Sequence, residues 1–182
     1  FWITIAAVPL LAIAAYAFPI IQTNSRTLEK SVVPKEAIKL NPEIIYPLKN
    51  YQRNGNRYLW GKNDCSTFVT DYMFASGKPA YLRLTTANLY SDATMKWHGY
   101  QQIKLTSIKP KDIIVFRYRG RHGNMQGHTG IVLSTGIQEI VVHNSLSGGG
   151  VVKNTVPEFL AIANRVASTQ NGQKMIKIFS PL

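Results

Sequence analysis

The chain has 182 residues, of which 45% are hydrophobic and 16% are charged, so it can bury the core of one modest domain and is not wholly disordered. Its net charge of +12 favours anionic surroundings such as lipid headgroups or an acidic cell-wall polymer, but no nucleic-acid-binding motif accompanies the charge, and no nucleic-acid partner is expected. A single cysteine, Cys65, excludes an internal disulfide and a cysteine-rich zinc site.

Residues 1–21, "FWITIAAVPLLAIAAYAFPII", contain no charged side chain. At about 1.5 Å per residue, this helix would span a hydrocarbon core of about 30 Å. The alternative is the apolar region of a signal peptide, with Ala15-Tyr16-Ala17 as a small-x-small cleavage site. We favour a transmembrane anchor; on either interpretation the rest of the chain is exported or lies against a membrane.

Residues 22–43 are polar, contain prolines and show no sustained period, which predicts a linker. The compact domain is expected to cover 44–182, and its first part is expected to be rich in turns. A helix is then predicted from Asp64, a candidate N-cap, because four apolar residues follow at helical spacing and Gly77 offers a stop. A second short helix is expected over 86–96.

Beyond this point the pattern changes to short β-branched runs punctuated by glycine, at 113–118, 129–133, 140–143 and 175–179. Residues 156–167 suggest a helical start that gives way to extended chain. Helices followed by strands predict an α+β fold in which the helix that carries the cysteine packs on a small antiparallel sheet.

Cys65 is placed at the first turn of the predicted helix, between Asp64 and Ser66. Free N–H groups and the helix dipole stabilise an anion there, so we expect a lowered thiol pKa and a sulfur that faces solvent. The alternative is a small buried hydrophobic residue, but such a cysteine usually has apolar neighbours.

A nucleophilic thiol needs a base, and His128 in "GHTGIVL" starts an apolar strand. His143 in "IVVHNS" ends the next strand, so antiparallel pairing would bring the two rings together and let His143 orient His128. Asn144 is the competing orienter. His98 and His122 lie in polar stretches and are expected at the surface.

Four segments, "YLWGKNDCSTFV", "IKPKDIIVF", "GHTGIVL" and "IVVHNS…GGGV", together resemble the NlpC/P60 cysteine peptidases over about residues 50–155. These are papain-like enzymes that cut peptides of bacterial peptidoglycan. The resemblance implies a papain-like fold and a Cys-His-His triad that needs no metal ion or cofactor. The bond expected to be cleaved is D-γ-glutamyl to diaminopimelate or lysine.

The resemblance also assigns roles to single residues. Cys65 matches the nucleophile, His128 the base and His143 the polar third member. Tyr58 matches a tyrosine that assists the oxyanion or the substrate, and the Cys65 N–H is a plausible oxyanion donor. Further residues match groups that bind the stem peptide or line its cleft: Asp64, Ser66, Arg83 and Thr85.

The chain departs from the family pattern where Lys62 and Lys111 replace glycines and where a long basic loop precedes His128. These changes affect specificity and remove no catalytic atom. The expected partners are peptidoglycan stem peptides, the membrane through residues 1–21, and other envelope proteins. The expected location is the bacterial cell envelope, on the periplasmic or extracytoplasmic side and anchored in the membrane. Two alternatives remain: a related papain-like amidase or acyltransferase, and a non-catalytic envelope or secretion-machine component that binds the wall.

Overall fold

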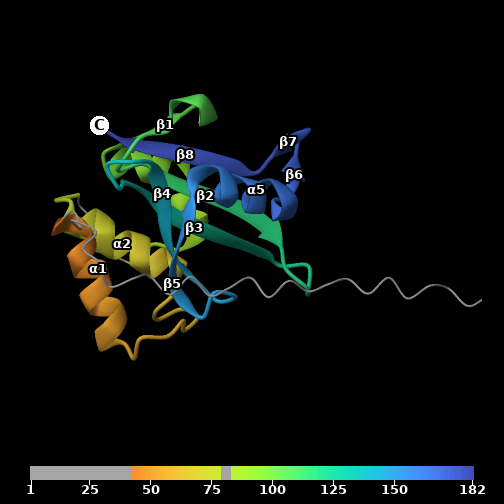
Figure 1. Cartoon of the computed structure of the whole chain (residues 1–182). Helices are drawn as coiled ribbons and strands as arrows, with labels where there is room; N and C mark the ends of the chain where they lie inside the picture. Colours follow the sequence, from red (N-terminus) through yellow and green to blue (C-terminus); the bar gives the residue numbers. More distant parts are fainter. Residues whose placement is uncertain (1–41, 79–82) are drawn as a thin grey trace, which may run out of the picture.

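The computed structural model describes residues 42–78 and 83–182, so the predicted anchor and all but the last two residues of the predicted linker lie outside the described residues. Within these ranges, no helix has the length and apolar character needed to cross a membrane. The elements follow one another in chain order (Figure 1) as α1 (Pro42–Arg53), α2 (Cys65–Ala75), α3 (Thr86–Leu89), α4 (Asp92–Trp97), β1 (Tyr100–Ile103), a 3-10 turn (Leu105–Ser107), β2 (Ile113–Arg119), β3 (Met125–Ser134), β4 (Glu139–Ser145), β5 (Gly150–Thr155), α5 (Val156–Val166), β6 (Thr169–Gln170), β7 (Gln173–Lys174) and β8 (Ile176–Pro181).

Six strands form one antiparallel sheet in the order β1-β8-β2-β3-β4-β5, and β6 and β7 form a separate small hairpin. Side chains alternate between the two faces of the sheet, as they do in any strand. Along β2, Ile113 and Val115 belong to the core on one face, while Ile114 and Phe116 belong to the core on the other. The predicted α+β class with a small antiparallel sheet is therefore confirmed.

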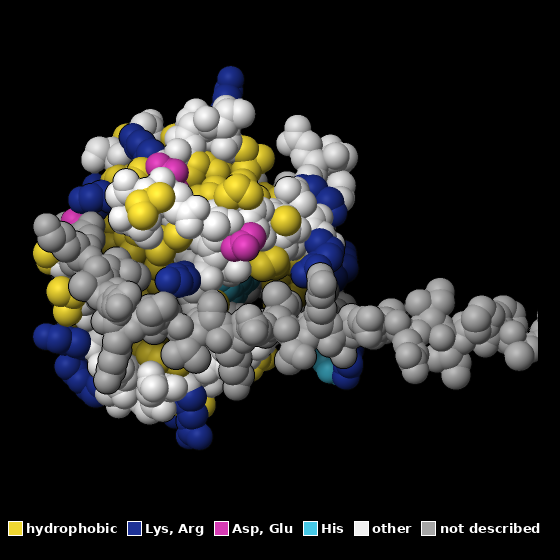
Figure 2. All heavy atoms as spheres, viewed as in Figure 1, with side chains coloured by type: hydrophobic (Ala, Val, Ile, Leu, Met, Phe, Trp, Pro, Cys, Tyr) yellow, Lys and Arg dark blue, Asp and Glu magenta, His cyan; other side chains and the backbone are white. Residues whose placement is uncertain are grey.

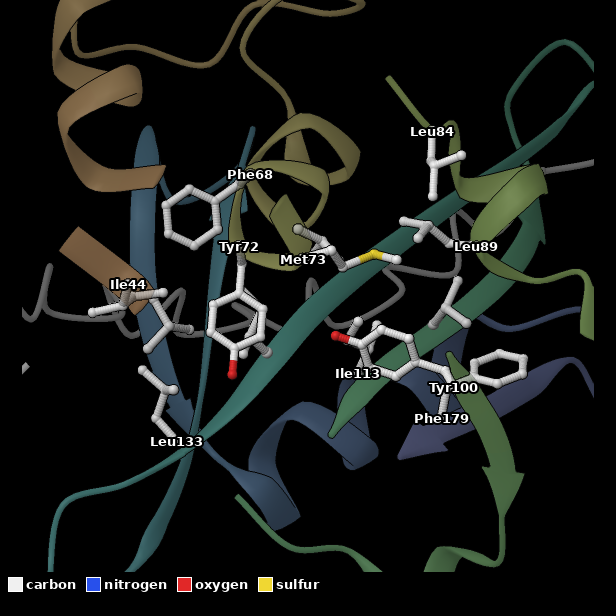
Figure 3. Close-up of a cluster of buried hydrophobic side chains, with 14 of the residues drawn as sticks. Ile44, Phe68, Tyr72, Met73, Leu84, Leu89, Tyr100, Ile113, Leu133 and Phe179 are labelled. Atoms are coloured by element: carbon white, nitrogen blue, oxygen red, sulfur yellow. The ribbon is translucent and has the colours of Figure 1, made fainter. Parts of the chain in front are cut away.

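The larger core lies between the sheet and helices α1 to α4. Figure 3 shows Phe68, Tyr72 and Met73 of α2 in one buried cluster with strand residues such as Ile113 and Leu133. These helical positions are the apolar ones predicted from the sequence, and α2 also begins after the predicted cap, because Asp64 accepts the Thr67 N–H.

The opposite face of the sheet is covered by α5, which packs against β4 and β5 through Phe159 and Ala163. The prediction that this segment turns into extended chain is wrong. Thr155 and Glu158 form a capping box and Pro157 occupies the first turn, so the helix continues to Val166.

Two further expectations require correction. Helix α1, of 12 residues, occupies a stretch for which no helix was predicted, and its buried residues Ile44, Pro47 and Tyr51 recur at helical spacing despite the prolines. The single helix expected over 86–96 is two helices, because Ser91 interrupts it and caps α4 by accepting the Thr94 N–H at 3.3 Å.

Candidate active site

The sheet divides where the predicted site residues meet. β3 pairs with β4 from Ile131–Val142 to Ser134–Glu139. Residues 125–131 of β3 pair with β2, on the side away from β4. Residues 140–145 of β4 pair with β5, on the side away from β3. The two strands therefore part next to His128 and His143, and backbone groups that face this opening are free to bond something other than a strand.

The N-terminal end of α2 occupies this opening. The Asn144 amide donates to the Asn63 carbonyl at 2.7 Å, and the Thr129 backbone N–H hydrogen bonds to the sulfur of Cys65. Thr129 directly follows His128, so the thiol lies against the strand that carries the predicted base. The split explains how a residue from the helical face reaches a strand inside the sheet.

Polar groups surround the sulfur of Cys65. The N–H groups of Cys65 and Ser66, at the start of α2, also point to it, and the Tyr58 hydroxyl hydrogen bonds to it. Three backbone donors and one hydroxyl thus converge on the predicted nucleophile. The sequence predicted the roles of Tyr58 and the Cys65 N–H but not that of Thr129. The contact of Thr129 with the thiol depends on how β3 and α2 pack together, which the sequence pattern does not show.

The expectation of a solvent-facing, low-pKa thiol is wrong. Cys65 is only 3% exposed. Burial raises the pKa of the Cys65 thiol from 9.0 to about 12, with the nearby Asp64 carboxylate adding to the rise, and the backbone donors lower it by less. The resting group is therefore a neutral thiol.

His128 and His143 are brought together as the sequence predicted. His128 Nε2 lies 2.8 Å from His143 Nδ1, and the rings meet edge to face. Phe159 of α5 packs against both rings, at centroid distances of 5.9 and 4.9 Å. Asn144, the competing orienter, bonds instead to the Asn63 carbonyl, whereas His143 contacts His128.

Gly130 makes room for this pair. A Cβ at position 130 would lie 2.5 Å from Val141 Cγ1 and 3.1 Å from the Cβ of His143. Any side chain there would push His143 away from His128. The glycine in "GHTG" is thus explained by a close approach between strands rather than by a turn.

Burial, together with the neighbouring His143, lowers the pKa of His128 to about 3, while Asp64 opposes the change. Burial also lowers the pKa of His143, and the hydrogen bond to the Asn154 oxygen opposes this. Both rings are therefore neutral at pH 7. A neutral imidazole can act as a general base toward a thiol that comes within reach of it.

Asp64 and Ser66 hold the turn that precedes the thiol. Asp64 Oδ1 accepts from Ser66 Oγ at 2.8 Å and from the Thr67 N–H at 2.9 Å, and its Oδ2 accepts from the Gly61 N–H at 2.8 Å. Burial alone would raise the pKa of Asp64, but these donors outweigh it and lower the pKa. Both side chains are buried, and their contacts are internal.

Arg83 bonds to the same turn from outside, through the Gly61 carbonyl and the Thr67 hydroxyl. It borders an open groove of about 400 Å³ whose other lining residues are Tyr46, Lys62, Thr67, Thr70, Asp71 and Phe74. Thr85 is the N-cap of α3 and its side chain is occupied there. Arg83 thus braces the loop before Cys65 rather than contacting the thiol.

The remaining histidines differ from each other. His122 is exposed, as expected. His98 is 4% exposed and packs edge to face on Trp97, so the prediction that it lies at the surface is wrong. Among residues 42–78 and 83–182, no group of three or more His, Cys, Asp and Glu is arranged to hold a metal ion.

The surface around the site is basic. Figure 2 shows lysine and arginine side chains distributed around one face, with few acidic ones and a histidine side chain inside a hollow near the centre. Neither a protein-family model nor a curated protein matches the chain. The functional argument therefore depends on the sequence motifs and on the geometry of this site.

Proposed function

We propose that the protein is a papain-like cysteine peptidase of the NlpC/P60 type that hydrolyses amide bonds in peptidoglycan stem peptides. The observation that carries the proposal is the convergence of Cys65, at the start of α2, with the strand that bears His128 and its partner His143. A thiol, a neutral imidazole and an orienting group are the parts that acyl transfer by cysteine requires.

In the proposed reaction, Nδ1 of His128 takes the thiol proton as the sulfur attacks the amide carbonyl. The C–S bond forms, and the oxyanion is stabilised by the N–H groups that surround the sulfur, with help from the Tyr58 hydroxyl. His128 then protonates the leaving amine as the C–N bond breaks. Water, deprotonated by His128, releases the acyl group as a carboxylic acid and restores the thiol.

The neutral resting state favours proton transfer during attack over a preformed thiolate–imidazolium pair. With the pKa of Cys65 near 12 and that of His128 near 3, the ion pair is the minor species before substrate binds. Substrate that displaces water and presents a carbonyl to the N–H groups would draw the proton across. His143 keeps the His128 ring aligned throughout.

The substrate class follows from the resemblance and the charge. A basic surface suits the acidic cell wall, and the family cleaves D-γ-glutamyl bonds to a diamino acid. The proposed location is the bacterial cell envelope outside the cytoplasm, with residues 1–21 as the membrane anchor. One observation favours a different function: a thiol that is 3% exposed also suits a non-catalytic domain that binds the wall.

The test is incubation of the full chain, in mild detergent, with defined peptidoglycan fragments, followed by mass analysis of the products. We expect scission between D-γ-glutamate and the diamino acid, abolished by Cys65→Ala. His128→Ala should lower kcat more than His143→Ala, because an orienter is partly replaceable. Release of intact stem peptide from the glycan would indicate an amidase, and binding without cleavage would indicate the wall-binding function.

A further inference from the structure

The hydrogen bonds behind the histidine pair continue beyond it onto the edge strand β5 and the first turn of α5. His143 Nε2 lies 2.9 Å from Asn154 Oδ1. The Asn154 side chain also hydrogen bonds to the Glu158 carboxylate, which in addition accepts the Thr155 N–H at 2.8 Å. Four side chains, His128, His143, Asn154 and Glu158, are thus linked in a row, which we call the relay.

The direction of every bond in the relay is set from its outer end. A carboxylate can only accept hydrogen bonds, so Asn154 must present its NH₂ group to Glu158 and its oxygen to His143. An amide oxygen can only accept, so Nε2 of His143 carries the proton. In a neutral imidazole the other nitrogen is then an acceptor, and Nδ1 of His143 must receive the Nε2–H of His128.

We infer that Asn154 and Glu158 are positioning residues that fix both histidines in the Nε2–H tautomer and leave Nδ1 of His128 as a bare lone pair. With the ring held in this state, the one free acceptor nitrogen of the base is the one that is not used by His143. In the proposed function, on which this role depends, that lone pair receives the Cys65 proton. With the relay reversed, His128 would present an N–H there instead and could not act as a base.

The surroundings of the relay support a single arrangement. His143 is 4% exposed, and Phe159 of α5 lies against both rings, so their movement is restricted from that side. Asn154 and Glu158 belong to the junction of β5 and α5, where Thr155 and Glu158 already form the capping box. The Glu158 carboxylate thus takes part both in the cap of α5 and in the relay that sets the tautomer of His128.

The test is nitrogen-15 NMR of the histidine rings in the full chain in detergent micelles at neutral pH, with signals assigned by single histidine substitutions. We expect a protonated Nε2 and an unprotonated Nδ1 for both His128 and His143. A protonated Nδ1 on either ring in the wild type would overturn the inference. This readout does not depend on catalysis, so the relay stands if no substrate is cleaved, and cleavage does not rescue it if the tautomers are wrong.

Substitutions at Asn154 distinguish the effect of hydrogen-bond direction on the histidine tautomers from the effect of side-chain packing. Asn154→Leu removes the acceptor, so both rings should become tautomer mixtures and kcat should fall about tenfold with KM unchanged. Asn154→Asp keeps an acceptor and should retain the wild-type tautomers, which would show that packing alone is not responsible. Lys153→Leu, on the same strand but paired with Val142 of the other face, is the matched control and should change neither spectrum nor rate.

Glu158→Lys is the sharpest variant, because it replaces an acceptor at the outer end by a donor. The Asn154 amide should turn over, and the population of Nδ1–H should rise at His143 and then at His128. Unchanged tautomers in Glu158→Lys would remove Glu158 from the relay, and unchanged tautomers in Asn154→Leu would remove the relay itself.

Discussion

At the scale of single residues, two opposing effects act on the Cys65 thiol. A helix N-terminus stabilises an anion by about 0.3–1 kcal/mol at exposed positions and by up to about 2 kcal/mol when partly buried. A rise in pKa from 9.0 to about 12 corresponds to roughly 4 kcal/mol against the thiolate. Burial therefore outweighs the helix dipole, and the sulfur becomes an effective nucleophile only when a base takes its proton.

The reactivity of Cys65 toward a neutral alkylating reagent should reveal this balance. Because the thiolate is a small fraction at pH 7, we expect slow alkylation that accelerates about tenfold per pH unit up to the limit of stability. A model peptide of residues 58–74 provides the unburied reference. Mass analysis of the Cys65 peptide over time gives the rate. Rapid alkylation with a plateau near pH 6 would show a preformed ion pair and contradict the neutral resting state.

At the scale of the elements, α2 is fastened to the split sheet by its N-terminal turn. Asp64 caps the helix and receives four hydrogen bonds, while Arg83 holds the same turn from outside. The resemblance gives Asp64 a second role, in binding the free amine of a stem peptide. Substitutions can separate the two roles, since capping needs an acceptor oxygen and amine binding needs the negative charge.

Asp64→Asn keeps a good N-cap, whereas Asp64→Ala removes it. We expect Asp64→Ala to lower the free energy of unfolding by about 1–2 kcal/mol, and Asp64→Asn to lower it by less, because Asn keeps the cap on Thr67 and loses only the acceptor for the Gly61 N–H. If Asp64 binds the amine, Asp64→Asn should still raise KM for a fragment with a free amine. Urea unfolding and steady-state kinetics measure the two effects. An equal loss of stability in both variants would show that the charge, not the cap, holds the turn.

The strongly periodic elements were predictable, and the elements defined by their partners were not. The helix after Asp64 is indicated by its cap and by the spacing of its apolar residues. The strands β2, β3, β4 and β8 are indicated by runs of β-branched residues. Helix α1 carries prolines that mimic a linker, and its apolar face is recognisable only once Ile44 and Tyr51 have a core to enter. Strand β1 reads "YQQI", whose ends alone are apolar, and β5 follows a run of glycines, so edge pairing rather than local pattern defines both strands.

At the scale of the whole molecule, the histidine pair links the site to the stability of the fold. Both rings are held neutral by burial, with the pKa of His128 lowered to about 3 and that of His143 lowered from 6.5. Below about pH 6.5 the unfolded chain binds protons that the folded chain does not bind. The contribution of the two histidines to the free energy of unfolding is therefore fully present above that pH, and it falls as the pH drops toward 3.

Between pH 6.5 and 5, we expect His128 to lower the free energy of unfolding by up to about 2 kcal/mol, since one pH unit corresponds to about 1.4 kcal/mol per proton, and His143 to act in the same direction. Urea unfolding of the full chain at several pH values measures the slope. The double variant His128→Gln with His143→Gln should flatten it. A slope that survives in the double variant would place the titrating groups elsewhere.

The contact between the two histidines of the candidate site was predictable from the sequence, but the residues that support them were not. Two histidines at neighbouring strand ends predict a contact, and the structure supplies it at 2.8 Å. The burial of Cys65 depends on the parting of β3 from β4, which no local pattern encodes. Asn154 was missed because β5 was not recognised as a strand, and its contact with His143 follows only from the pairing of β4 with β5.

The most direct test of the central claim is to trap the acyl intermediate. The full chain is mixed with a defined stem-peptide fragment, quenched in acid after milliseconds to minutes, digested, and analysed by mass for the peptide that contains Cys65. We predict a thioester on Cys65 with the mass of the N-terminal product, absent in Cys65→Ser and strongly reduced in His128→Ala, which lacks the base that takes the thiol proton. Cleavage that proceeds without any adduct on Cys65, or that persists in Cys65→Ser at the wild-type rate, would contradict the account.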